Sequence, residues 1–175
     1  MDITSALALI RPIPDFPKPG ILFQDISPLL VNAQAFSVVI EELSKIDPDA
    51  HTVAGVEARG FILGSAMALH RKNGFVPIRK KGKLPHTTFS RSYGLEYGSD
   101  ELEIHIDAIS PGEKVLLVDD VLATGGTIEA ALQLIADVGG ICNHVVVLCE
   151  IDFLEGRSAL TQKYPGLSIT TLVHA

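Results

Sequence analysis

The segment Val115–Thr127, VLLVDDVLATGGT, constrains the fold of this chain more than any other stretch of the sequence. It opens with four apolar residues, 115–118, a run typical of a strand that helices cover on both faces. Two adjacent acids, Asp119 and Asp120, follow, and a turn of small, hydroxylic and glycine residues then leads into a predicted helix over 128–138. Because ligands in α/β sheets bind at the carboxyl ends of strands, this segment predicts a binding site as well as a fold.

The rest of the chain alternates strand and helix signals around this segment. Strands are predicted at Thr52–Val56, Phe75–Ile78, His144–Leu148 and Leu167–Val173, and helices over Ala33–Ile46 and from Arg59 through Ala68. Such alternation is the pattern of a doubly wound sheet. We therefore expect an α/β fold with a central, mainly parallel sheet flanked by helices.

Two stretches break the alternation, and they set the predicted domain organisation. Residues 1–32 are rich in proline and are interpreted as an irregular arm with one short extended piece, whereas residues 33–175 form the core domain. Within the core, residues 79–107 begin as a basic loop punctuated by glycine and end in one half-exposed strand, Leu102–Asp107. A loop this long inside a compact domain is usually functional, so we expect a flexible lid.

Composition excludes several classes of function. The 175 residues include 21 Asp and Glu against 14 Lys and Arg, a net charge of −7 that argues against general binding to nucleic acid or a membrane surface. No apolar stretch approaches the roughly 20 residues that span a bilayer, and Met1-Asp2-Ile3 lacks the basic flank of a signal peptide. The spacing of Cys142 and Cys149 fits neither a redox pair nor a zinc site, which favours reduced thiols and a cytoplasmic protein.

The turn after the acid pair has the chemistry of a phosphate cradle. Its residues are Ala123, Thr124, Gly125, Gly126 and Thr127. Backbone N–H groups, two hydroxyls and the positive end of the following helix suit a phosphate monoester. Since two carboxylates would repel that anion directly, Asp119 and Asp120 fit sugar hydroxyls or a hydrated Mg²⁺ better. Cradle and acid pair together describe a ribose 5-phosphate pocket; the alternative is an ordinary helix start beside a solvated acidic turn.

This segment resembles the signature of the type I phosphoribosyltransferases, which is a strand, two acids and a Thr-Gly-Gly-Thr turn. Other stretches are similar to the same family, and they lie at Pro19–Phe23, Asp25–Pro28, Glu57–Phe61, Arg79–Pro85 and Tyr93–Gly98. The resemblance extends from Pro14 nearly to the end of the chain, and the arm and the Leu95–Gly98 stretch are its most specific parts.

The resemblance implies an enzyme of purine salvage in which adenine and phosphoribosyl pyrophosphate give AMP and pyrophosphate. Mg²⁺ would be carried by the pyrophosphoryl substrate, with no direct protein ligand. The N-terminal arm would form a small hood over the base, the lid would close over the ribose, and the chain would work as a homodimer.

The resemblance also implies roles for individual residues. Glu96 matches the catalytic acid, assisted by Arg59 and Lys83, and Tyr97 would pack over the sugar in the closed lid. The residues implied to bind pyrophosphate are Arg59, Gly60, Arg79, Lys80 and Lys83, some of them reaching across the dimer interface. The residues implied to contact the base are Leu22, Phe23, Gln24 and Ile151. Gln24 stands where many relatives carry arginine, which leaves a backbone contact possible.

Three alternatives stay open. The base could be another purine, such as xanthine or hypoxanthine. The chain could be a regulator that senses phosphoribosyl pyrophosphate without catalysis, although only about 30 residues precede the first core helix, too few for a three-helix DNA reader. A response-regulator type of domain is supported by the acid pair alone. No Walker A loop or Gly-x-Gly-x-x-Gly fingerprint occurs, and no histidine pair has the spacing of metal ligands.

Overall fold

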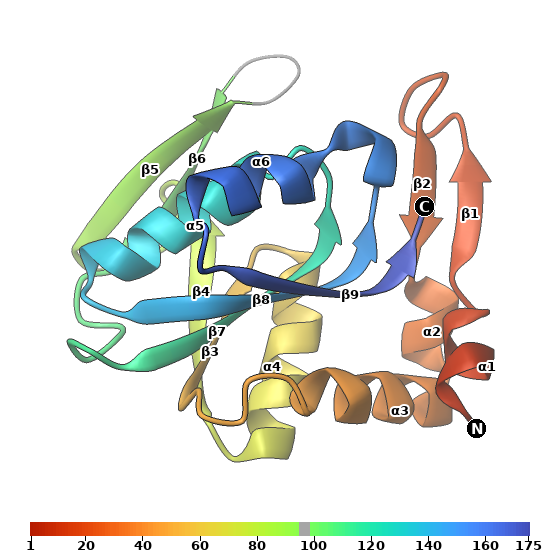
Figure 1. The fold of residues 1–175 in the computed structure, drawn as a ribbon, viewed down its shortest axis with the longest axis horizontal. Helices are drawn as coiled ribbons and strands as arrows, with labels where there is room; N and C mark the ends of the chain where they lie inside the picture. The colour runs from red at the N-terminus through yellow and green to blue at the C-terminus, as the bar shows by residue number, and fades with distance from the viewer. Residues whose placement is uncertain (95–98) are drawn as a thin grey trace. The chain divides into compact units, whose positions relative to one another are not determined.

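The computed structural model describes residues 1–94 and 99–175, and the chain divides into two compact units, Met1–Lys45 and Ile46–Ala175 (Figure 1). The first unit holds a two-stranded antiparallel sheet and three helices. Its elements are α1 (Ile3–Leu7), β1 (Arg11–Pro14), β2 (Leu22–Asp25), α2 (Ser27–Val31) and α3 (Ala33–Ser44). The residues expected to be mostly irregular therefore form a helix and a β-hairpin before α2.

Helix α3 begins where the sequence analysis placed it. The Asn32 side chain accepts the Ala35 N–H at 3.1 Å and caps the helix. The residues Ala35, Val39 and Leu43 share one face and are fully buried. Because α3 packs against α1 and α2, it belongs with the first unit, one helix beyond the boundary expected after residue 32.

The second unit is built on a seven-stranded sheet. Its elements are β3 (Thr52–Val56), α4 (Arg59–Arg71), β4 (Gly74–Lys80), β5 (Thr88–Gly94), β6 (Ser99–His105), β7 (Lys114–Leu122), α5 (Gly126–Asp137), β8 (Ile141–Glu150), the 3₁₀ helix η1 (Asp152–Leu154), α6 (Gly156–Lys163) and β9 (Ser168–His174). The strand order is β5-β6-β4-β3-β7-β8-β9. Strands β4, β3, β7, β8 and β9 run parallel, while β6 and β5 are antiparallel additions. The predicted α/β fold is confirmed.

Strand β7 is buried on both faces, as its apolar run predicts. Val115 and Leu117 join a core cluster with residues of α5, whereas Leu116 and Val118 are equally buried and alternate to the opposite face. Helix α4 covers that opposite face, and α5 lies on the other side of the sheet (Figure 1). The sheet is thus the middle layer of three.

The connections leave the centre of the sheet in opposite directions. From β3 the chain crosses through α4 to β4 on one side, and from β7 it crosses through α5 to β8 on the other. Such a reversal between neighbouring parallel strands opens a crevice at their carboxyl ends. In this fold that edge holds Val56 of β3 and Leu122 of β7, next to the acid pair and the cradle.

The predicted loop at 79–107 contains more structure than expected. Arg79 and Lys80 lie at the end of β4, and β5 pairs with β6 along its whole length, from Thr88 opposite His105 to Gly94 opposite Ser99. The expected strand is present as β6, which is antiparallel to β4, but the loop before it is shorter than expected because β5 was not predicted.

Candidate active site

The phosphate cradle follows the end of β7 and becomes the first turn of α5. Gly125 precedes the helix with φ of +89°, a conformation that favours glycine. The first complete helical hydrogen bond runs from Glu129 N–H to the Gly125 carbonyl oxygen at 2.9 Å. The N–H groups ahead of it are those that a helix leaves without helical acceptors, so they are available to an anion.

The acid pair is buried at the edge where the cradle begins. Asp119 and Asp120 are each only 7 % exposed, and Asp119 Oδ1 accepts the Asp120 N–H at 2.8 Å. Burial raises the pKa of Asp119 well above its ordinary value, and the neighbouring Asp120 raises it further. Burial also raises the pKa of Asp120, against the opposing influence of Arg59. Two such carboxylates are strong acceptors for sugar hydroxyls.

We expect Asp119→Asn to raise thermal stability at neutral pH while it impairs the site. Because the folded pKa of Asp119 is raised, the cost of ionising it is absent below the ordinary pKa of 3.8 and grows as the pH rises toward the folded value. Asparagine retains an oxygen for the Asp120 N–H. Each 1 kcal/mol recovered raises Tm by about 2–4 °C in a domain of this size. Melting curves of the variant and the wild type from acidic to neutral pH test this. A Tm difference between the two that does not widen as the pH rises would contradict it.

Arg59 reaches the acid pair from the start of α4. Its Nε lies 2.8 Å from Asp120 Oδ2, and its side chain is 36 % exposed at the crevice. Gly60 permits this approach, since an added Cβ would lie 2.9 Å from the Val118 carbonyl oxygen. The peptide bond between Glu57 and Ala58 is cis. Arg59, Gly60 and the acid pair are therefore brought together, as predicted.

The basic residues at the end of β4 are paired with acids of the same chain. Arg79 Nε and Glu57 Oε2 are 3.3 Å apart, and the Lys80 N–H donates to the same oxygen at 3.0 Å. Burial opposes ionisation of Glu57, but these bonds lower its pKa overall. Arg79 Nη1 donates to the Lys83 carbonyl oxygen at 3.1 Å, which ties Lys83 to the group. Acidic residues of the same chain thus pair with the basic stretch that begins at Arg79.

The two strands of the lid hairpin are anchored beside the cradle. The Tyr93 hydroxyl donates to Asp100 Oδ2 at 3.1 Å, and Lys80 Nζ pairs with the same oxygen at 2.7 Å. Burial raises the pKa of Tyr93, and the nearby Asp100 carboxylate raises it further. A Cβ added to Gly126 of the cradle would lie 3.3 Å from the carbonyl oxygen of Gly94, the last residue of β5. Sequence reasoning assigned no role to Tyr93, Asp100 or Glu57, because their roles depend on pairings across the sheet.

Glu96 and Tyr97 lie outside the described residues, between Gly94 and Ser99. The residues that the resemblance implies for the base fall into the two units, and each unit is described by itself. Leu22, Phe23 and Gln24 lie in β2, where Phe23 packs edge to face on Phe16 with ring centres 5.1 Å apart. Ile151 belongs to the second unit, and its N–H donates to the Leu122 carbonyl oxygen at 2.9 Å, directly before the cradle.

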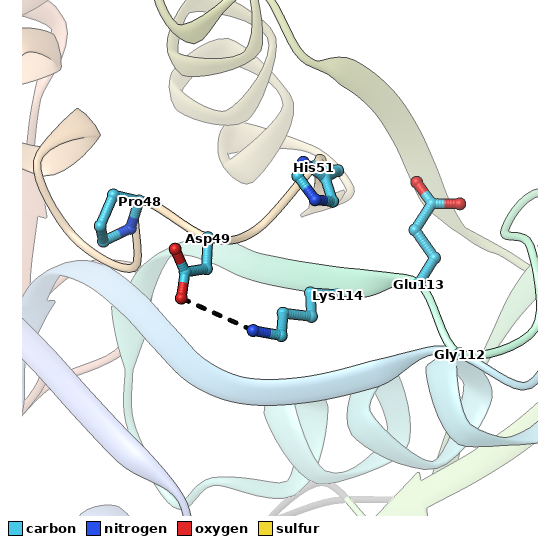
Figure 2. A pocket seen from close by; sticks show the side chains of 6 residues that line it. All are labelled: Pro48, Asp49, His51, Gly112, Glu113 and Lys114. Atoms are coloured by element: carbon cyan, nitrogen blue, oxygen red, sulfur yellow. Dashed lines mark ion pairs between the residues drawn. The ribbon is translucent and has the colours of Figure 1, made fainter.

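A surface pocket lies at the opposite edge of the sheet, near the amino ends of β3 and β7. Figure 2 shows its lining residues, Pro48, Asp49, His51, Gly112, Glu113 and Lys114. Asp49 Oδ2 and Lys114 Nζ are 3.6 Å apart across it. None of the described residues predicted for the site lines this pocket. No helix among the described residues is long and apolar enough to cross a membrane.

Comparison with known proteins identifies the class. The sequence matches the phosphoribosyl transferase domain over residues 29–164. The adenine phosphoribosyltransferase of a Chelativorans species is 52 % identical over 173 residues, 95 % of this chain and 92 % of that protein.

Solved structures agree over nearly the whole chain. The adenine phosphoribosyltransferase of Thermoanaerobacter pseudethanolicus is 46 % identical with a TM-score of 0.92, covering 99 % of both chains. That of Saccharomyces cerevisiae, solved with an imino-altritol bisphosphate and adenine, is 37 % identical with a TM-score of 0.89, covering 97 % of this chain and 99 % of that chain.

The chain therefore belongs to the phosphoribosyl transferase family, the class that its fold and cradle define. Within that family it groups with the adenine phosphoribosyltransferases, which confirms the resemblance described from the sequence.

Proposed function

We propose that the chain transfers the phosphoribosyl group of phosphoribosyl pyrophosphate to N9 of adenine, giving AMP and pyrophosphate. The bond from ribose C1 to the pyrophosphate oxygen breaks, the bond from C1 to N9 forms, and the base loses the N9 proton. The observation that carries this proposal is one sheet edge where the cradle, the buried acid pair and Arg59 meet. A chain of this family is a pentosyltransferase.

The cradle and the acid pair would hold the ribose 5-phosphate end of both substrate and product. The backbone from Ala123 to Thr127 would donate to the phosphate oxygens, and the hydroxyls of Thr124 and Thr127 would add two donors. Asp119 and Asp120 would accept the hydrogens of the ribose hydroxyls. Burial removes water from these carboxylates, and the hydroxyls of the bound ribose would replace that water as hydrogen-bond donors.

The pyrophosphate would lie between the start of α4 and the end of β4. Arg59 and Gly60 come from the first, Arg79 and Lys80 come from the second, and Lys83 follows three residues later. Glu57 holds Arg79 and the Lys80 backbone, so that the two groups lie close to each other. Guanidinium and ammonium groups balance the charge that grows on the departing pyrophosphate.

Magnesium would arrive with the substrate. The acid pair fits a hydrated ion, because it offers buried carboxylate oxygens at the edge where pyrophosphate would lie. When bound, Mg²⁺ would neutralise negative charge on the pyrophosphate. No described residue is proposed as a direct ligand.

The base would be held by the hood and by Ile151. Leu22, Phe23 and Gln24 would contact adenine from β2, largely through main-chain groups, and Ile151 would give an apolar contact. Glu96 would stabilise the positive charge that grows on the ribose or accept the proton of the base, with Tyr97 over the sugar.

An assay of AMP formation from adenine and phosphoribosyl pyrophosphate tests the function directly. Adenine should be used with a far higher kcat/KM than hypoxanthine or xanthine, because a site built to bond one set of polar groups rejects their replacement. Faster reaction with another purine would transfer the proposal to that base. Binding of phosphoribosyl pyrophosphate without turnover of any base would favour the sensing alternative.

We also propose that the chain works as a homodimer in the cytoplasm. Helix α4 supports the first part, since Ile62 and Leu69 lie seven residues apart on one face and are 41 % and 81 % exposed. The thiols of Cys142 and Cys149 are unpaired, as in a reducing compartment. Sedimentation of an Ile62→Asp/Leu69→Asp variant should give a monomer.

Mixing two variants tests whether the partner completes the lid. If Lys83 serves the site of the partner, a dimer of one Lys83→Ala chain and one Glu96→Gln chain has one intact site and one with both lesions. Equal mixing with random association should then recover about a quarter of wild-type specific activity. If Lys83 serves its own chain, every site carries a lesion and mixing restores nothing.

A further inference from the structure

The start of α6 lies directly behind the phosphate cradle. A Cβ added to Gly156, the first residue of α6, would lie 2.1 Å from the Ala123 carbonyl oxygen and 3.0 Å from the Gly125 nitrogen. In return, a Cβ added to Gly125 would lie 3.1 Å from the Gly156 carbonyl oxygen. The two backbones touch without side chains between them, so a movement of α6 must move the cradle.

The next residue, Arg157, ties the start of α6 to β8 and β9. Its Nε donates to both carboxylate oxygens of Glu150, at 2.9 and 3.1 Å, and its Nη1 donates to the Ile169 carbonyl oxygen at 2.7 Å. Its Nη2 donates to Thr171 Oγ1 at 3.0 Å and also bonds Glu150. A planar guanidinium with this many partners fixes both the distance and the angle between the helix and the strands.

Glu150 carries this constraint to both ends of the substrate site. It is 5 % exposed and lies opposite Leu122 of β7, the residue before the cradle. The residue after it, Ile151, donates its N–H to Leu122 and belongs to the proposed base site. Hydrogen bonds from Arg157, and then from Thr171, lower the pKa of Glu150, so the buried carboxylate is charged and depends on these donors.

The same carboxylate also lies near Asp152 and His174, in a group whose ligand atoms are within 4.8 Å of one another and could hold a metal ion. Its oxygens already accept from Arg157 and Thr171, and His174 Nδ1 and Asp152 Oδ1 are 2.8 Å apart. The contacts therefore favour a structural anchor over a metal site.

We propose that Arg157 is a positioning residue for the transfer reaction: by joining Glu150 to the start of α6, it holds the phosphate cradle and Ile151 in register. This inference rests on the proposed function, but it concerns a residue that contacts neither substrate. Removing the guanidinium leaves a buried carboxylate without its charge partner and releases α6 from the strands, so the cradle loses its fixed position.

Kinetics of Arg157→Met, which retains an unbranched apolar side chain but has no donor, test the proposal. We expect KM for phosphoribosyl pyrophosphate to rise about tenfold and KM for adenine to rise, with a smaller change in kcat. Arg157→Lys, which restores the charge opposite Glu150, should recover part of the loss.

Arg71→Met is the matched control. Arg71 also anchors backbone, through the carbonyl oxygens of Ile46, Asp47 and Ala50 at 2.6 to 3.0 Å, but at the opposite edge of the sheet. Both variants should lower Tm, and only Arg157→Met should raise KM. An Arg157→Met protein that is less stable but has wild-type KM values would overturn the proposal.

Gly156→Ala gives a second route if Arg157→Met does not fold. Its Cβ must push α6 away from Ala123, so KM for phosphoribosyl pyrophosphate should rise although all donors of Arg157 remain; a wild-type KM would overturn the proposal. Calorimetric binding of AMP makes the same comparison without turnover. Wild-type chain that forms no AMP would count against the proposed function, whereas wild-type AMP affinity in Arg157→Met counts against the positioning role.

Discussion

Replacing Arg59 by methionine should lower kcat/KM for phosphoribosyl pyrophosphate by about 10³-fold, within the range of about 2–5 kcal/mol or more found when one partner of a buried charge pair is removed. Two losses combine. The pyrophosphate loses a guanidinium that can bind it through two parallel bonds, and Asp120, which is 7 % exposed, loses the cation 2.8 Å away. Steady-state rates at varied phosphoribosyl pyrophosphate measure the effect, with Arg71→Met as the control that should retain wild-type kinetics.

The two roles of Arg59 can be separated in an Asp120→Asn background. If Arg59 serves only to neutralise Asp120, then Arg59→Met should cost nothing more once that carboxylate is gone. If Arg59 also binds pyrophosphate, as proposed, Arg59→Met should still lower kcat/KM strongly in this background. Arg59→Lys should fall between wild type and Arg59→Met, because an ammonium retains the charge but not the paired geometry. If Arg59→Met causes no further loss of kcat/KM in the Asp120→Asn background, Arg59 serves only as the partner of Asp120.

The sequence predicts well those elements whose own apolar residues indicate that they are buried. Strand β3 has the predicted bounds, Thr52–Val56, and all five of its residues are buried. Strand β7 extends past its apolar run to include the acid pair, because the ladder with β8 continues through Asp119 to Leu122. Helices α4 and α5 each differ from prediction by one turn or less at their ends.

Elements held mainly by their neighbours were not predicted. Strand β5 has no buried residue, and only its pairing with β6 makes it a strand. Helix α6 buries only Gly156 and Leu160, so its sequence carries little helical periodicity. Strand β1 contains Pro12 and Pro14, which argue against a central strand, and it forms only in a two-stranded sheet opposite β2.

The site shows the same division. The turn from Ala123 to Thr127 and the acid pair were predictable because one short segment holds them. Arg59 was also predicted at this site, but its pairing with Asp120 was not, and neither was the pairing of Arg157 on α6 with Glu150, because the residues around an arginine on a helix do not show which acid it will pair with. Proximity created by the sheet, between residues 61 and 7 positions apart for these two arginines, decides both pairings.

Glu96→Gln should lower kcat by about 10²-fold or more with little change in substrate affinity, the scale of a positioned acid–base group. Glutamine matches the shape of glutamate but cannot hold a negative charge opposite the ribose as the bond to pyrophosphate breaks. The described residues on either side support this role. Gly94 is adjacent to the cradle, since a Cβ on Gly126 would lie 3.3 Å from its carbonyl oxygen, and Asp100 bonds Tyr93 and Lys80.

Glu101→Gln provides the matched control for that variant. Glu101 lies on β6 of the same hairpin and pairs with Lys81 at 2.7 Å, with both side chains partly exposed and no proposed contact to substrate. An exposed pair of this kind contributes about 0–1 kcal/mol, so Glu101→Gln should retain wild-type kcat. Pre-steady-state rates should show that Glu96→Gln slows the transfer step and not product release. Equal loss in the two variants, or no loss in Glu96→Gln, would show that Glu96 is an ordinary solvated residue of the lid.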